Sequence, residues 1–238
     1  MALPKPPVPT YELELPSTEK PVKFRPFLVS EEKVLLMAME SEDEKQIQDA
    51  VVNIVKSCVL TRGIKVSDLA SFDIEYLFLN IRAKSVGEEV EMKITCSDDN
   101  ETQVNYTLDL NEVKVQKTPE HTNTILLDDT TGLIMKYPGM DQFIKTQIMM
   151  KSLNAEEVFD IIVDSVDQIF VGEDVYEAKN TPRKEIEEWI GGLTSKQFEK
   201  VKDFFATMPK LSHTFIVKNP KTGVESEYTI EGLVNFFG

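Results

Sequence analysis

The spacing of apolar residues changes period several times along this sequence, and these changes limit the possible folds more than any other feature. Apolar residues recur at threes and fours over residues 30–84, alternate with polar residues over residues 88–136, and return to threes and fours after residue 140. The first spacing is typical of helices and the second of strands. The sequence therefore predicts an α+β fold, with helical segments framing a strand-rich middle region and with a C-terminal β-hairpin.

Four consecutive regions follow from these changes. Residues 1–29 are predicted to form a proline-rich arm with short strands, because each proline removes a main-chain donor and favours extended structure in the residue before it. Residues 30–87 are predicted to be helical, residues 88–139 to be rich in strands, and residues 140–238 to be a mixed α/β region. A chain of 238 residues is long enough for one large domain or two small ones.

Three helices are predicted in the helical region. The first begins at Ser30, a capping residue followed by acidic residues in the first turn. The second ends at Gly63, and the third covers residues 72–84, where apolar residues are so dense that we expect this helix to be the most buried. The apolar face of the first helix is predicted to consist of Val34, Leu35, Ala38 and Met39.

The rest of the chain offers strands, turns and further helices. The acidic run SDDNE at residues 97–101 suits the turn of a hairpin, and Gly172 suits the turn of another. The C-terminal hairpin is predicted to turn at residues 219–223. Further helices are predicted at residues 140–151, 155–163, 184–190 and 194–208.

The chain is acidic, with 41 Asp and Glu residues against 26 Lys and Arg residues, a net charge of −15. Nucleic acids and anionic membranes are bound through Lys and Arg, so we expect neither as a partner. No apolar run reaches the roughly 18 residues that span a bilayer, and the N-terminus lacks the apolar core of a signal peptide. Two interpretations of the charge stay open: it keeps an abundant protein in solution, or it forms an acidic face that docks basic partners.

No residue pattern predicts a catalytic, metal or cofactor site. Cys58 and Cys96 are isolated from each other in the sequence, and so are His121 and His213, whereas a metal site needs several converging ligands. The acidic run at residues 97–101 lacks the glycine and the final glutamate of a calcium-binding loop, so a solvated turn is expected. The sequence contains no nucleophile motif and no phosphate-binding glycine loop. We therefore expect no catalytic residue and no cofactor.

Candidate partner-binding residues lie in the arm. Tyr11, Leu13 and Leu15 alternate with glutamates in a strand period, which would suit addition to an exposed sheet edge. The apolar side chains would then contact the partner, while the main chain supplies the hydrogen bonds.

Other candidates lie just before the helical region and at the C-terminus. Arg25 stands between two rigid neighbours, and its guanidinium would either grip a partner carboxylate in bidentate fashion or pair inside its own fold with Glu31 or Glu32. Phe236 and Phe237 are paired aromatic residues at a chain end, which need a pocket in this protein or in another.

Several stretches resemble a family of baseplate proteins from T-even-type bacteriophages. They are residues 5–10, residues 22–38 (VKFRPFLVSEEKVLLMA) and residues 71–88 (SFDIEYLFLNIRAKSVGE), with looser similarity at residues 132–140 and 231–237. The resemblance implies a non-enzymatic baseplate hub component of a contractile-tailed phage, which is assembled in the host cytoplasm and binds other hub or tail proteins in the virion.

Two alternatives to a virion subunit remain open. One is a hub assembly chaperone that leaves before the particle is complete, and the other is a cell-wall hydrolase, since any acidic chain offers pairs of carboxylates. The turn at residues 219–223 lacks the cysteines with which such a ribbon could hold a metal ion, so a zinc role is not expected.

Overall fold

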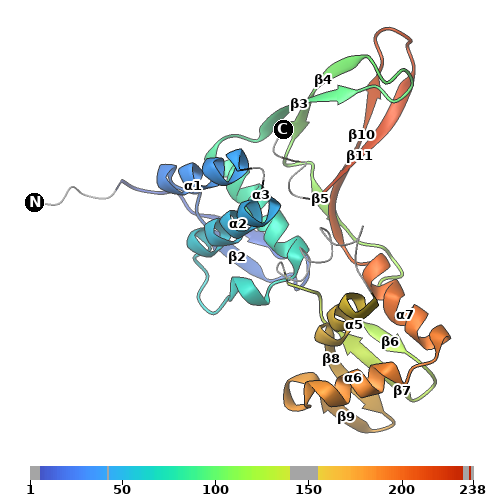
Figure 1. The fold of residues 1–238 in the computed structure, drawn as a ribbon. Coiled ribbons are helices and arrows are strands. Elements are labelled where there is room, and N and C mark those ends of the chain that lie inside the picture. Colours follow the sequence, from blue (N-terminus) through green and yellow to red (C-terminus); the bar gives the residue numbers. More distant parts are fainter. Residues whose placement is uncertain (1–5, 42, 140–154, 233–235, 237–238) are drawn as a thin grey trace, which may run out of the picture. The chain divides into compact units, whose positions relative to one another are not determined.

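The structure is a computed structural model that describes residues 6–41, 43–139, 155–232 and 236. It contains both helices and antiparallel strands, which confirms the α+β fold class (Figure 1). The chain divides into two compact units, each built from segments that are distant in sequence. Unit 1 consists of Met1–Asp68, Phe72–Gln116 and Lys210–Gly238, and unit 2 consists of Leu69–Ser71 and Lys117–Pro209.

The helices of unit 1 are α1 (Val29–Glu40), α2 (Glu44–Cys58) and α3 (Ser71–Ser85), with a short 3-10 turn η1 (Val66–Asp68) before α3. The carboxylate of Asp43 caps α2 by accepting hydrogen bonds from the amides two and three residues further on. Apolar residues occur on all sides of α3, and its burial confirms the prediction for this helix. Its fully buried apolar side chains are Phe72, Ile74, Leu77, Phe78, Leu79 and Ile81.

Helix α1 differs from its prediction at its start and in the face that it buries. It begins at Val29, so Ser30 lies inside the first turn and is not the cap. Leu35 and Ala38 are buried as predicted, whereas Val34 is exposed. The apolar spacing did not decide between these sides because α1 has apolar residues around most of its circumference, and packing against α2 selects one of them.

The N-terminal arm forms the predicted hairpin, made of β1 (Tyr11–Glu14) and β2 (Pro21–Phe24). Its turn is fixed to α3, because the Ser17 amide donates to one carboxylate oxygen of Asp73 at 3.0 Å and the Ser17 hydroxyl bonds the other. A bridge between Phe24 and the residue after α2 holds the opposite end. The arm is therefore a docked part of unit 1.

Two β-ribbons complete unit 1 and lie side by side in Figure 1. The first pairs β3 (Glu89–Thr95) with β4 (Gln103–Asp109), and the second pairs β10 (Lys210–Lys218) with β11 (Glu225–Glu231), the C-terminal hairpin predicted from the sequence. β5 (Lys114–Gln116) adds to the start of β10. The apolar cluster beneath these strands contains Leu79, Ala83, Val90, Leu108, Leu110, Val113, Leu211 and Phe236.

An aromatic stack and a polar clasp join the two ribbons. Tyr106 of β4 stacks on Phe215 of β10, with ring centroids 4.0 Å apart. At the turns, the Asn219 amide donates to both oxygens of Asp98 at 2.9 and 3.1 Å, and the Thr222 hydroxyl donates to the same carboxylate at 2.5 Å. These hydrogen bonds lower the pKa of Asp98. The predicted acidic turn is thus present, and it binds the C-terminal turn as well as facing solvent.

Unit 2 contains one antiparallel sheet with its strands in sequence order. The strands are β6 (Thr124–Leu126), β7 (Thr131–Met135), β8 (Val166–Val171) and β9 (Asp174–Glu177). β8 and β9 form the hairpin predicted around Gly172, whose φ of 62° suits glycine at a tight turn.

Helices cover one face of this sheet. They are α5 (Ala155–Asp164), α6 (Arg183–Gly191) and α7 (Ser195–Ala206), and the 3-10 turn η2 (Ala178–Asn180) links β9 to α6. The helices predicted at residues 155–163, 184–190 and 194–208 are confirmed, and the one predicted at residues 140–151 lies outside the described residues. The core between sheet and helices contains Ile125, Leu133, Met135, Ile162, Ile169, Ile186, Ile190, Val201 and Phe204.

Candidate interaction surfaces

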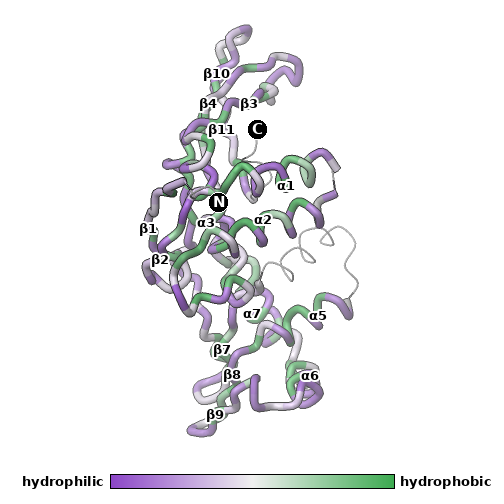
Figure 2. The backbone as a smooth tube through the Cα atoms, turned by 90° about the vertical axis from the view of Figure 1, so that its left-hand side faces the viewer, coloured by the Kyte–Doolittle hydropathy of each residue, from purple (hydrophilic) through white to green (hydrophobic). Residues whose placement is uncertain are grey.

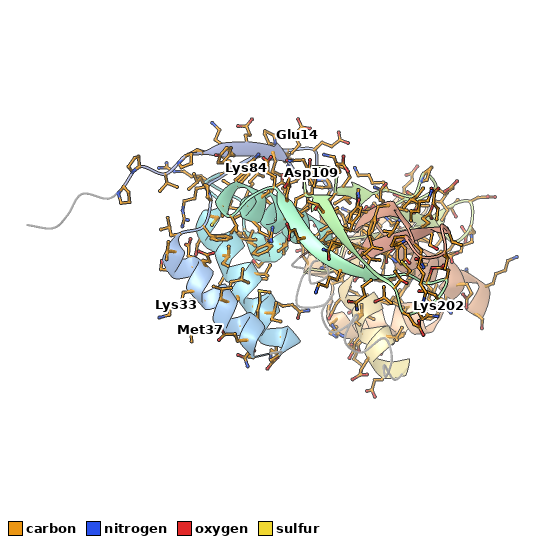
Figure 3. The ribbon with its side chains drawn as sticks, turned by 90° about the horizontal axis from the view of Figure 1, so that it is seen from above. Glu14, Lys33, Met37, Lys84, Asp109 and Lys202 are labelled. Carbon is orange, nitrogen blue, oxygen red and sulfur yellow. The ribbon has the colours of Figure 1, made fainter. Side chains whose placement is uncertain are left out.

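The outer side of α1 carries a group of exposed apolar side chains. Val29, Leu36 and Met37 are 82, 52 and 60% exposed. Together with Lys33 they are spaced at i, i+4, i+7 and i+8, so they lie on one side of the helix, which we call the α1 outer face. Figure 3 shows Lys33 and Met37 on the same side of α1, directed away from the neighbouring helices.

The α1 outer face is not required for the core of unit 1, because α1 already packs on α2 and buries Leu35 and Ala38 on its opposite side. Figure 2 shows hydrophobic residues in α1 as well as in the buried α3. A helix that is apolar on all sides is normally covered on all sides. Burial of apolar surface stabilises by about 25 cal/mol per Å², so the α1 outer face is chemically suited to bind an apolar surface of another protein.

The predicted binding residues of the arm face their own unit. Tyr11 and Leu13 are half-buried and Leu15 is buried. The Tyr11 ring lies 5.8 Å from that of Phe24, and the Lys84 ammonium lies 5.7 Å from its centroid. These side chains therefore hold the arm in place. Among the described strands β1 pairs only with β2, so strand addition at its other edge stays a prediction.

Arg25 pairs inside its own fold, the second of its two predicted arrangements. Its guanidinium donates two hydrogen bonds of 2.8 Å to the carboxylate of Glu31 and others to the carbonyls of Pro26 and Ser57. The hydrogen bond from Arg25 is the main cause that lowers the pKa of Glu31, against the opposing effect of burial. Arg25 thereby joins the arm to the start of α1 and the end of α2.

Of the two C-terminal aromatic residues, Phe236 and Phe237, the structure describes only Phe236. Phe236 is fully buried and packs with Leu79, Leu108 and Leu211 in the core of unit 1. The pocket that it needs is thus within its own chain, which corrects the expectation that it anchors a partner. Phe237 lies outside the described residues.

The two side chains best suited to catalysis, the Cys58 thiol and the His121 imidazole, are both held in structural positions. Burial raises the pKa of the Cys58 thiol to about 12, so it stays protonated at neutral pH and is a poor nucleophile. Nδ1 of His121 lies 2.9 Å from the Thr207 hydroxyl and Nε2 lies 3.0 Å from the Tyr137 hydroxyl, and burial lowers the pKa of this ring. In the described ranges, no three His, Cys, Asp or Glu side chains converge as metal ligands.

The fold and these surfaces define an α+β protein with an exposed apolar side on helix α1. No helix in the part of the chain that the structure describes is long and apolar enough to span a membrane. The chain belongs to the family of T4 bacteriophage base plate proteins, whose family model matches residues 8–238. No curated protein and no solved structure matches it. Membership of this family indicates a structural role in the tail baseplate of the virion, in contact with other baseplate proteins.

Proposed function

We propose that this chain is a non-enzymatic component of the baseplate hub of a contractile-tailed phage and that it acts in tail assembly by binding other hub proteins. Family membership supports a baseplate protein whose partners are other baseplate proteins. The observation that carries the binding role is the α1 outer face, on which Val29, Leu36 and Met37 are exposed without a covering element among the described residues. Such a face fits an apolar surface on a partner.

The proposal is tested with a variant that carries Leu36→Glu and Met37→Glu. Both residues are exposed, so the fold of unit 1 should tolerate the change, whereas burying two new carboxylates in an interface is strongly unfavourable. We expect recovery of hub proteins with the tagged chain from phage-infected cells to fall about tenfold or more, a loss of at least about 1.4 kcal/mol in binding. Quantitative mass spectrometry of the eluate and of purified virions provides the measurement.

A matched control is Val224→Glu, because Val224 is an exposed apolar residue of the same unit that lies just before β11. It should leave recovery of hub proteins unchanged, and circular dichroism should show both variants folded. Equal recovery with the α1 variant would remove the α1 outer face from the proposal, and the absence of hub proteins from every eluate would contradict the hub assignment. Recovery of hub proteins by a chain that is missing from virions would identify the assembly chaperone instead.

A further inference from the structure

The sheet of unit 2 ends in an edge strand that is open to pairing. β9 pairs with β8 on one side, and no described strand pairs with its other side. In this hairpin Val171 and Asp174 flank a two-residue loop, so they form a hydrogen-bonded pair and Phe170 and Val175 form the next, non-bonded pair. The amide and carbonyl of Val175 consequently point away from β8 and are available to another strand.

The opposite edge of the same sheet is occupied. Leu126 of β6 pairs with Gly132 and has its own main chain directed outward, but the Lys200 ammonium donates to its carbonyl at 2.7 Å. Lys200 belongs to α7, which contacts β6, and covering an edge strand with a helix is a common means of preventing pairing with another chain. Of the two edges of this sheet, β9 is therefore the one that invites an added strand.

Side chains on both faces of β9 would support such a strand. Val175 and Tyr176 are 58 and 52% exposed and point to opposite faces, because neighbouring residues of a strand alternate. Val175 stands beside Phe170, whose ring lies against Gly132 so closely that a Cβ on this glycine would be 2.5 Å from the ring. An incoming segment with alternating side chains finds apolar surface on each face.

The charge around β9 indicates which residues an added strand should carry. Glu173 and Asp174 lie at the β8–β9 turn, and Asp128 and Asp129 lie at the β6–β7 turn. The two turns are in contact, because the Gly172 amide donates a 2.9 Å hydrogen bond to the Thr130 carbonyl. Within the described part of the chain, these four carboxylates form no ion pair. Glu177, by contrast, is paired with Lys179 at 3.2 Å. The excess negative charge favours a basic segment.

A second copy of the chain fits this edge poorly. Antiparallel pairing of β9 with itself through the outward-facing main chain of Val175, centred on that residue, would set Glu173 of one copy opposite Glu177 of the other. Like charges directly opposite each other in a sheet are destabilising. The occupant is therefore better sought among other proteins.

We infer that the outer edge of β9 accepts, as an added strand, an extended segment of another baseplate protein in which Lys or Arg alternates with apolar residues. The inference rests on the proposed function for the class of partner, and it names the chemistry that the partner must present. Main-chain hydrogen bonds to Val175 would supply affinity, and the carboxylates at the two turns would supply selectivity.

The test uses two fluorescein-labelled peptides on the full chain. The first is acetyl-Lys-Val-Thr-Val-Lys-Val-Thr-amide, and the second has glutamate in place of each lysine. We expect the basic peptide to bind about tenfold or more tightly than the acidic one in fluorescence anisotropy, with affinity that falls as salt is added. Hydrogen exchange should show that the basic peptide protects the Val175 amide. Equal binding of the two peptides, or an unprotected Val175 amide, would overturn the inference.

Variants localise the binding. Val175→Pro removes an outward-facing donor while leaving the bonds to β8, and we expect it to weaken binding of the basic peptide about tenfold. Leu126→Pro, the matched change on β6, and Val175→Thr, which keeps the donor, should bind as the unchanged chain does. Unchanged binding by Val175→Pro would contradict the inference, and if this variant does not fold, the exchange result on the unchanged chain decides. Failure of the peptide with normal recovery of hub proteins would refute this inference alone and leave the proposed function standing.

Discussion

At the scale of single residues, Arg25 links three elements through one bidentate contact with Glu31, and both side chains are less than a fifth exposed. Arg25→Ala should lower the free energy of unfolding by about 2 kcal/mol at neutral pH, because it leaves a mostly buried carboxylate without its cationic partner. The pKa of Glu31 is lowered in the folded state, so the stabilisation is present above its ordinary value of 4.5 and is lost as pH falls through the folded value. Urea denaturation at several pH values measures both effects.

The matched control for this residue is Lys23→Ala. Lys23 lies two residues earlier and pairs with Glu12 at 3.9 Å, but both side chains are more than half exposed. Exposed pairs contribute little, so the change should alter stability by less than about 0.5 kcal/mol. A similar loss in both variants would show that the burial of the Arg25–Glu31 pair does not affect its contribution to stability.

At the scale of elements, α7 has a complete cap at its first turn. The Thr194 hydroxyl accepts from the Gln197 amide, and the Gln197 side chain accepts from the Thr194 amide at 3.0 Å. Thr194→Ala should destabilise unit 2 by about 1 kcal/mol, seen as a lower midpoint of thermal unfolding, whereas Thr194→Ser keeps the oxygen and should cost far less. Equal losses from the two substitutions would mean that the methyl group, not the cap, matters.

At the scale of the whole molecule, each compact unit has its own apolar core. Leu133 is fully buried in that of unit 2 and Leu108 in that of unit 1. Each Leu→Ala change should cost about 2–5 kcal/mol, and hydrogen exchange should show faster exchange mainly within the unit that carries the change. Loss of protection in both units after either substitution would show that they unfold as one cooperative body.

Much of the element order follows from local patterns. The arm hairpin, the burial of α3, the turn at Gly172 and the C-terminal hairpin were all predictable, because apolar period, proline and glycine act over a few residues. The apolar spacing of α1 is less informative, since residues on nearly every side are apolar and the spacing predicts burial of Val34, which is exposed. For the same reason the sequence did not predict the α1 outer face. The only indication of this face is that α1 has more apolar residues than one buried side of a helix needs.

By itself, the sequence determined the fold class, the positions of most helices and strands, the acidic charge and the resemblance that the family match bears out. The tertiary structure alone decided that Arg25 pairs with Glu31, that Asp98 binds Asn219 from 121 residues away, and that Phe236 fills a pocket in its own unit. It also decided which strands stand at the sheet edges. The physical reason is that period and turn chemistry are local, whereas burial and strand order depend on contacts between segments that the sequence does not place together.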